Sequence, residues 1–442
     1  MTKSVNSREI ALDVLYEILE NKEYSHIVLR QALNKYQYLD KQERSFITRI
    51  VDGTLEYLIQ IDYMINQLSK VKVKKMKPVI RTILRMSVYQ IMYMDRVPDS
   101  AACDEAVKLA VKRKFQGLKG FVNGVLRNIS RQKESFVWPS DSVRYSIPEW
   151  ILEMWKERYD QETITAMAQS FLKPSKLAVR CNLDKASKEQ ITESLKEQKV
   201  QIETSAYSDI ILFLSEYDYL EGLNAYTSGW IQVQDMSSSF VAQAAPLKPG
   251  DYVIDVCGAP GGKSLHVADR LKGTGMVDVR DLSEQKVGMI RENISRTGFT
   301  NIQAKVQDAL EPDQDSVEKA DVLFADLPCS GLGIMGKKPD IKINMTKEKA
   351  EDLAGLQREI LSVVWQYVKP GGYLIYSTCT INSKENEENV RWFREHYPFE
   401  PVNIEGRLGD NLKEESMKEG FIQLLPGIHP CDGFFLSVFR RR

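Results

Sequence analysis

The chain has 442 residues but few cysteines and histidines, and none of them has the spacing of a metal or disulfide motif. Its six cysteines form no CxxC pair, and its four histidines form no HExxH pair. We therefore expect no metal site and no disulfide framework. No uninterrupted apolar run of about 18 residues occurs, and the first ten residues lack the apolar core of a signal peptide. These absences favour neither secretion nor membrane insertion, so we predict a cytoplasmic protein.

The net charge is −1, but the charge is unevenly distributed along the chain. Residues 1–135 hold 24 lysines and arginines against 15 acidic residues, whereas the remainder holds 36 against 46. Because nucleic-acid affinity comes largely from neutralising phosphates, the basic first segment favours a polyanionic partner. A solvated helical surface explains the same excess equally well.

Three segments of the chain differ in their pattern. Residues 7–135 place apolar side chains one helical turn apart, which predicts an all-helical domain, with one helix beginning at Pro78 and another capped by Asp99 or Ser100. Residues 139–235 mix helix and strand patterns. From about residue 250, strands alternate with helices, which predicts a parallel, doubly wound α/β sheet of the Rossmann-like type. We therefore predict a multidomain protein: a helical domain at 1–138, a small α+β domain at 139–235 and an α/β domain at 236–442.

A glycine-rich turn, DVCGAPGGK at residues 255–263, closes the first strand of the predicted α/β domain. Pro260 occupies the position of the second glycine of a dinucleotide fingerprint, and no phosphate-binding GxxxxGK[ST] loop is formed. Asp281 and Asp308 close the next two strands. Carboxylates at successive strand ends suit the ribose, adenine and sulfonium of S-adenosylmethionine better than a phosphate. The alternative is that each aspartate caps the helix that follows it.

Two cysteines follow later strands of the same sheet, Cys329 in DLPCSGLG and Cys379 in YSTCT. Ligands of doubly wound sheets bind at this edge. Carbon 5 of a cytosine is scarcely nucleophilic until a thiolate adds to carbon 6, so a cysteine at the edge is a candidate nucleophile for methylation of carbon 5. Asp326 can hold a proton on the ring nitrogen, and the charge of Lys263 can favour a thiolate. This chemistry does not decide which cysteine attacks.

Four motifs, DVCGAPGGK, DLPCSGLG, KKPDIK and YSTCTINSKENEENV, resemble those of the RNA 5-methylcytosine methyltransferases of the NOL/NOP2/Sun family. The segments LRMSVYQIMYMDRVPDSAACDEAVKLAVK and GFVNGVLRNI resemble a NusB-type RNA-binding domain. The resemblance covers nearly the whole chain. It implies a NusB-like helical domain, a class I methyltransferase domain, S-adenosylmethionine as cofactor and 16S ribosomal RNA as substrate.

The resemblance also implies roles for individual residues. It makes Cys379 the nucleophile and gives Cys329 a part in product release, and it implies cofactor contacts from Cys257, Gly258, Ala259, Pro260, Gly261, Gly262, Lys263, Asp281, Asp308 and Asp326. One departure is that Gly336, Lys337 and Lys338 precede Pro339, where the family commonly has two arginines. Lysine keeps the charge but loses the bidentate phosphate contact of arginine.

Some expectations concern partners and lesser motifs. We expect ribosomal RNA, unassembled or partly assembled, as the partner of a monomer. A non-catalytic RNA-binding or antitermination factor and a transfer RNA methyltransferase are the alternatives. The stretch ENEENV, residues 385–390, is expected to be the solvated acidic start of a helix, and HPCDGFFLSVFRR to supply terminal strands. The remaining cysteines are expected to be small buried residues, namely Cys103, Cys181 and Cys431.

Overall fold

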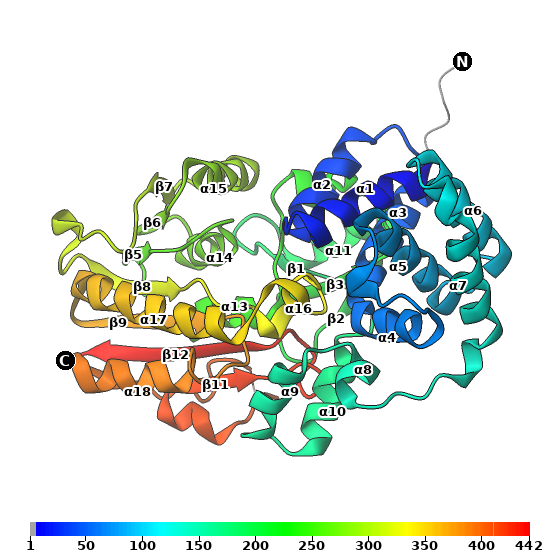
Figure 1. Cartoon of the computed structure of the whole chain (residues 1–442). Coiled ribbons are helices and arrows are strands. Elements are labelled where there is room, and N and C mark those ends of the chain that lie inside the picture. Colours follow the sequence, from blue (N-terminus) through cyan, green and yellow to red (C-terminus); the bar gives the residue numbers. More distant parts are fainter. Residues whose placement is uncertain (1–5, 175, 410) are drawn as a thin grey trace. The chain divides into compact units, whose positions relative to one another are not determined.

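The structure is a computed structural model that describes residues 6–174, 176–409 and 411–442 (Figure 1). It divides into two compact units, each discontinuous in sequence. The helical unit comprises Met1–Lys173 and Met335–Met345, and the sheet unit comprises Pro174–Ile334 and Thr346–Arg442. The chain thus leaves the sheet unit for eleven residues and then returns to it. Within the described ranges, every helix is too short or too polar to cross a membrane.

The helices between residues 7 and 131 of the helical unit are amphipathic and share one apolar core. Its first helix buries Ile10, Val14 and Ile18, which lie on one face because they are four residues apart. The helices are α1 (Ser7–Glu20), α2 (Ser25–Lys35), α3 (Lys41–Glu56), α4 (Leu58–Leu68), α5 (Pro78–Tyr93), α6 (Asp99–Lys112), α7 (Lys119–Arg131), α8 (Asp141–Tyr145), α9 (Glu149–Lys156), α10 (Gln161–Ser170) and α16 (Ile341–Asn344). The all-helical prediction for the first part of the chain is confirmed.

Two helix starts in this unit test the predicted boundaries. Helix α5 begins at Pro78 as predicted, since the missing amide proton of proline has no partner in a first turn anyway. The predicted cap of α6 is wrong: Pro98 holds the N-cap position, and neither Asp99 nor Ser100 supplies a side-chain cap. The Asp99 carboxylate instead accepts a hydrogen bond from the Ser130 hydroxyl at 2.6 Å, which ties α6 to α7.

The segment Met335–Met345 packs into the helical unit although the sequence places it between two elements of the α/β domain. Ile343 contacts the helical core, and Asp340 accepts a hydrogen bond from the Ser25 hydroxyl. The ammonium of Lys342, which is buried, donates to the carbonyl of Glu56 at 3.3 Å. Burial lowers the pKa of Lys342 to about 8. Apolar, polar and charged contacts therefore all fix this segment in the helical unit.

The first sheet of the sheet unit is antiparallel, with the strand order β2-β3-β1-β4. Its elements are β1 (Leu177–Cys181), α11 (Lys188–Glu197), β2 (Gln201–Thr204), β3 (Ile211–Ser215), α12 (Asn224–Thr227) and β4 (Ile231–Val233). The predicted α+β character is confirmed, with β1, α11 and β3 where the sequence indicated. Strands β2 and β4 were not predicted, because β2 is mostly exposed and β4 has only three residues.

The second sheet has the order β10-β12-β9-β8-β5-β6-β7, with β11 paired to β12 (Figure 1). Strands β5 to β9 are parallel, as predicted, and the predicted terminal strand β12 is antiparallel, which makes the sheet mixed. Its elements are α13 (Met236–Ala244), β5 (Tyr252–Asp255), α14 (Gly262–Leu271), β6 (Met276–Asp281), α15 (Glu284–Thr297), β7 (Ile302–Val306), β8 (Ala320–Asp326), α17 (Lys347–Val364), β9 (Val368–Thr378), α18 (Glu387–His396), β10 (Phe399–Pro401), β11 (Phe421–Leu424) and β12 (Phe434–Arg441).

Helices cover both faces of this second sheet. Val253 on β5 belongs to the apolar core beneath α13, α14 and α15, whereas its neighbour Ile254 belongs to the core beneath α17 and α18. Successive strand residues point to opposite faces, so a sheet covered on both sides needs continuous apolar strands such as VLFA. The α/β prediction is confirmed, and the carboxyl ends of β5, β6, β8 and β9 form the edge at which a ligand is expected. The domain boundaries at 138/139 and 235/236 stay predictions.

Candidate active site

The two strand-end cysteines lie beside each other at the carboxyl edge of the second sheet. Strands β8 and β9 are parallel neighbours with Asp326 opposite Ser377, so the residues that follow both strands emerge together. The sulfur atoms of Cys329 and Cys379 are 3.4 Å apart and share a hydrogen bond. The amide of Gly333 also donates to the carbonyl of Cys379 at 3.0 Å, which holds the two loops together.

An ion pair lies next to the thiols. The ammonium of Lys263, in the first turn of α14, is 2.6 Å from Oδ2 of Asp326. The Ser377 hydroxyl donates to Oδ1 of the same carboxylate at 2.7 Å. Burial acts to lower the pKa of Lys263, but Asp326 outweighs it and the pKa is raised. The lysine is therefore a fixed cation. The structure thus brings together four predicted residues, Lys263, Asp326, Cys329 and Cys379.

The hydrogen bond to Cys379, together with burial, raises the pKa of the Cys329 thiol well above its usual value. Cys329 is consequently a neutral thiol at physiological pH. A neutral thiol can donate a proton or a hydrogen bond but is a poor nucleophile, because the thiolate is the attacking species.

The stretch ENEENV is not the solvated helix start that the sequence suggested. Glu385 is fully buried, and its carboxylate accepts hydrogen bonds from the Ser330 amide at 2.8 Å, from the Ser330 hydroxyl, from Asn382 at 2.8 Å and from Gln357 at 3.0 Å. Burial raises the pKa of Glu385 despite these donors. Ser330 follows Cys329, so the carboxylate anchors the loop that carries this thiol.

Asn386 anchors the other cysteine loop. Its amide oxygen accepts from the Thr378 hydroxyl at 2.6 Å, and its amide nitrogen donates to the carbonyl of Thr380 at 3.1 Å. Thr378 and Thr380 flank Cys379, and the Thr380 hydroxyl lies 2.7 Å from the Ser330 hydroxyl. One buried Glu-Asn pair therefore fixes both thiols. Sequence reasoning missed it because charged and amide residues ahead of a helix usually face water.

The glycine turn at the end of β5 needs its glycines for packing and for backbone conformation. A Cβ on Gly258 would lie 2.3 Å from a methyl group of Val279, so no larger residue fits there. Gly261 has φ = 102° as the N-cap of α14, a conformation that favours glycine. Burial, followed by the neighbouring aspartates, raises the pKa of Cys257, which therefore contributes a neutral thiol to this turn.

Asp281 and Asp308 do not cap helices, which removes the structural alternative considered for them. The N-cap of α15 is Ser283, and the Asp308 carboxylate accepts from the Leu310 amide at 2.9 Å within a turn. The Asp281 carboxylate accepts from the Ala259 amide at 3.0 Å and the Leu282 amide at 2.8 Å, and it lies 3.0 Å from the ammonium of Lys286. A carboxylate offers about four lone-pair positions. The half-exposed Lys286 side chain must move if two ribose hydroxyls are to bind.

The motif KKPDIK belongs to a different unit from these residues. Asp340 and Lys342 belong to the helical unit, where both are buried. Lys337 and Lys338, which replace the family's arginine pair, belong to the same segment. The motif therefore helps to attach the segment to the helical unit, a role that its sequence does not indicate.

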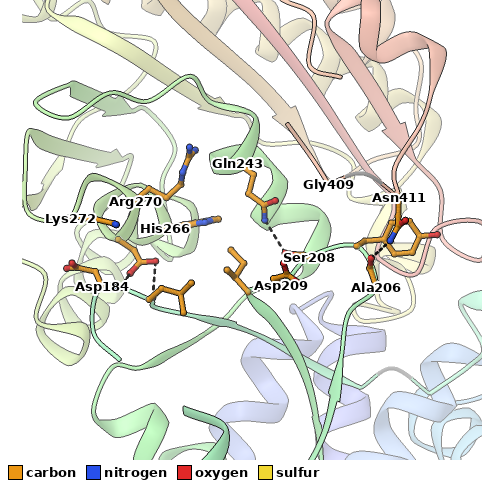
Figure 2. A pocket seen from close by; sticks show the side chains of 14 residues that line it. Asp184, Ala206, Ser208, Asp209, Gln243, His266, Arg270, Lys272, Gly409 and Asn411 are labelled. Carbon is orange, nitrogen blue, oxygen red and sulfur yellow. Dashed lines mark hydrogen bonds between the residues drawn. The ribbon is translucent and has the colours of Figure 1, made fainter. Parts of the chain in front are cut away.

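A separate cavity of about 700 Å³ lies elsewhere in the sheet unit (Figure 2). The turn 206–210, Gln243 of α13, and His266 and Arg270 of α14 line it. None of the predicted catalytic or cofactor residues is among the residues that line it. Burial, with Arg180 and Arg270 nearby, lowers the pKa of His266 well below its usual value, so the imidazole is neutral. The predicted chemistry at the sheet edge therefore does not depend on this cavity.

Three family models match successive parts of the chain. They are the NusB family over residues 5–131, the ferredoxin-like domain of RsmF/B-like methyltransferases over residues 147–218, and the 16S rRNA methyltransferase RsmB/F over residues 242–440. The first seven helices thus match a NusB-like domain, the first sheet lies in the ferredoxin-like domain and the second sheet in the Rossmann-like methyltransferase domain, while the ferredoxin-like match begins within the helical unit.

Full-length relatives make the assignment more specific. The chain is 35% identical, over the full length of both chains, to the probable ribosomal RNA small subunit methyltransferase B of Bacillus subtilis (strain 168). It is 30% identical to the corresponding protein of Synechocystis sp., with 99% of this chain and 100% of that protein covered. The chain belongs to the RsmB/F family of 16S ribosomal RNA methyltransferases.

Solved structures share the same architecture. The crystal structure of PH0851 superposes with a TM-score of 0.83 and 25% identity, covering 99% of each chain. A methyltransferase homolog protein from Pyrococcus horikoshii has a TM-score of 0.59 and 26% identity, covering 69% of this chain and 100% of that one. The first similarity extends over all three domains.

Proposed function

We propose that the protein transfers a methyl group from S-adenosylmethionine to carbon 5 of a cytosine in 16S ribosomal RNA. The observation that carries this proposal is the pair of thiols, 3.4 Å apart, beside the Lys263–Asp326 ion pair. Methylation of an oxygen or nitrogen needs only a base and correct positioning, whereas a pyrimidine carbon needs covalent activation. The names of the relatives, ribosomal RNA small subunit methyltransferase B, support the choice of RNA.

In the proposed reaction, the thiolate of Cys379 attacks carbon 6 of the cytosine and makes carbon 5 nucleophilic. S-adenosylmethionine, when bound, supplies the methyl group that carbon 5 accepts. The proton of carbon 5 then passes to solvent, and the electron pair of that C–H bond expels the sulfur of Cys379 as a thiolate. Cys329, whose sulfur lies next to that of Cys379, takes part in this release. Asp326 holds a proton on the ring nitrogen, which draws electrons from carbon 6 and favours cytosine.

The residues around the glycine turn fit the cofactor. Asp281, the last residue of β6, and Asp308, two residues after β7, provide acceptors for hydroxyl and amino groups. Asp281 would hold the ribose hydroxyls, and Asp308 the adenine amino group. The same carboxylates would repel a phosphate, so a dinucleotide fits less well.

Replacing Asp281 by alanine is expected to weaken S-adenosylmethionine binding roughly tenfold to hundredfold, because a hydrogen bond to a charged group contributes about 1.5–3 kcal/mol. Isothermal titration calorimetry gives the Kd, and Asp315→Ala, at an exposed position of the same sheet unit, is the matched control. An unchanged Kd with a lowered melting temperature would make Asp281 a structural anchor for the Ala259 amide.

The function itself is tested by incubating the protein with S-adenosylmethionine carrying a tritiated methyl group and with unmethylated 16S ribosomal RNA. We expect label in the RNA, and bisulfite sequencing should place it at a cytosine. Tight RNA binding without transfer would favour a non-catalytic binding factor. Transfer to transfer RNA alone would identify the other substrate class.

A further inference from the structure

The positive charge of the helical unit is concentrated in one part of the sequence. Residues 1–69 hold eight lysines and arginines against ten acidic residues, whereas residues 70–135 hold 16 against five. Five of these 16 are lysines within eight positions, Lys70, Lys72, Lys74, Lys75 and Lys77. They lie in the connection between α4 and α5, which we call the lysine loop (residues 69–77).

The lysine loop has a defined conformation. Val73 and Met76 are 1% and 6% exposed, and they anchor the loop in the helical core. The amide of Val73 donates to the side-chain oxygen of Asn66 at 2.9 Å, and the Ser69 hydroxyl accepts from the Val71 amide at 3.1 Å. All five lysine side chains are exposed. The anchors therefore hold the five cations on the surface at nearly fixed backbone positions.

In the part of the chain that the structure describes, none of these five lysines forms an ion pair with a carboxylate. The Lys72 ammonium donates only to the carbonyl of Asn66, at 3.0 Å. Two nearby acids are already engaged by arginines of α5, Glu20 by Arg81 and Asp62 by Arg85. The first turn of α5 contains no acidic residue. Among the residues that the structure describes, no carboxylate therefore neutralises the positive charge of the loop by an ion pair.

Helix α6 of the same unit provides the contrast. Its Lys108 lies 2.7 Å from Glu105, and its Lys112 lies 2.6 Å from Glu9. These two lysines are as exposed as those of the lysine loop, yet each has a carboxylate partner. Local basic composition alone thus does not mark a binding surface; the absence of a partner distinguishes the loop.

We propose that the lysine loop binds the phosphate backbone of the RNA substrate. Five like charges within eight residues repel one another, and a polyanion relieves this repulsion while releasing its own counterions. Ammonium groups act as point charges without bidentate geometry, so the loop provides affinity and position without reading sequence. The inference rests on the proposed function only in taking the polyanion to be ribosomal RNA.

The test compares two variants with the same change in charge. Binding of in vitro transcribed 16S ribosomal RNA is measured without S-adenosylmethionine. Filter binding is carried out between about 50 and 300 mM KCl, a range that brackets the physiological ionic strength of about 0.15 M. The slope of log K against log salt is negative, and each lost phosphate contact on a single strand makes it less steep by about 0.7. We expect the slope for Lys74→Gln/Lys75→Gln to be less steep than that of the wild type by about 1.4. We expect Lys108→Gln/Lys112→Gln to leave it nearly unchanged.

The proposal would be overturned if Lys74→Gln/Lys75→Gln had the same slope as the wild type and the same melting temperature. It would also be overturned if the slope changed equally in Lys74→Gln/Lys75→Gln and in Lys108→Gln/Lys112→Gln. Methyl transfer is measured separately. With saturating RNA, Lys74→Gln/Lys75→Gln should keep the wild-type kcat and raise only KM. If the wild type binds RNA but methylates no cytosine, the proposed function fails, while a reduced slope in the loop variant still supports the loop as an RNA-binding surface.

Discussion

Replacing Cys379 by alanine is expected to reduce methyl transfer to 16S ribosomal RNA below detection, whereas replacing Cys329 by alanine is expected to trap a covalent protein–RNA adduct. Without Cys379, no sulfur is available to add to carbon 6, and carbon 5 stays unreactive. Without Cys329, addition can still occur, but release of the methylated product is impaired. The two thiols are only 3.4 Å apart, so their roles are separable only by these different products.

The adduct is measured by denaturing electrophoresis with labelled RNA, in which only a covalent complex comigrates with the protein. Cys431→Ala is the matched control, because Cys431 is another partly exposed cysteine of the sheet unit. Both active-site variants should bind S-adenosylmethionine almost as the wild type does. An adduct with Cys379→Ala and none with Cys329→Ala would reverse the two roles.

The features that the sequence predicted are those determined by short-range pattern. Strands such as VLFA are apolar throughout because both faces of their sheet are covered, and parallel strands end at one edge. Placing Asp326, Cys329 and Cys379 at two such ends was therefore enough to predict that they lie near one another. The 3.4 Å sulfur separation and the Lys263–Asp326 ion pair are consistent with that prediction.

The features that the sequence did not predict depend on contacts between distant residues. Glu385 looks like a surface residue until Ser330, 55 positions away, supplies its amide and hydroxyl. Lys342 and Asp340 look like solvent-facing charges, yet they are buried against helices whose sequence lies about 300 residues earlier. Local spacing does not contain such partners, and composition favours the exposed alternative.

The segment Met335–Met345 also has a consequence for catalysis. It begins six residues after Cys329, and it is held in the helical unit by buried groups. The loop that carries this thiol is therefore tethered at its far end to the unit that we propose binds RNA. Within the sheet unit, Glu385 holds the same loop at Ser330, the residue after Cys329. Cys329 thus directly precedes the residue that this carboxylate holds.

Replacing Glu385 by alanine is therefore expected to lower kcat roughly hundredfold, the loss typical of a displacement of about 1 Å at a reacting group. The variant leaves the Ser330 amide, Asn382 and Gln357 without their buried acceptor, so the loop can no longer hold Cys329 against Cys379. The Kd for S-adenosylmethionine should stay near the wild-type value, because the carboxylate contacts no residue of the glycine turn.

Glu395→Ala is the matched control for this prediction, since Glu395 is an exposed glutamate of α18, the helix that follows Glu385. Glu385→Gln should give an intermediate kcat, because an amide keeps one acceptor oxygen but turns its NH2 group toward donors. General unfolding would lower kcat and weaken cofactor binding together. A positioning role instead lowers kcat with cofactor binding intact, and some covalent adduct should accumulate in Glu385→Ala itself, because Cys329 is then displaced from Cys379. Wild-type kcat in Glu385→Ala would show that the thiols keep their arrangement without this carboxylate.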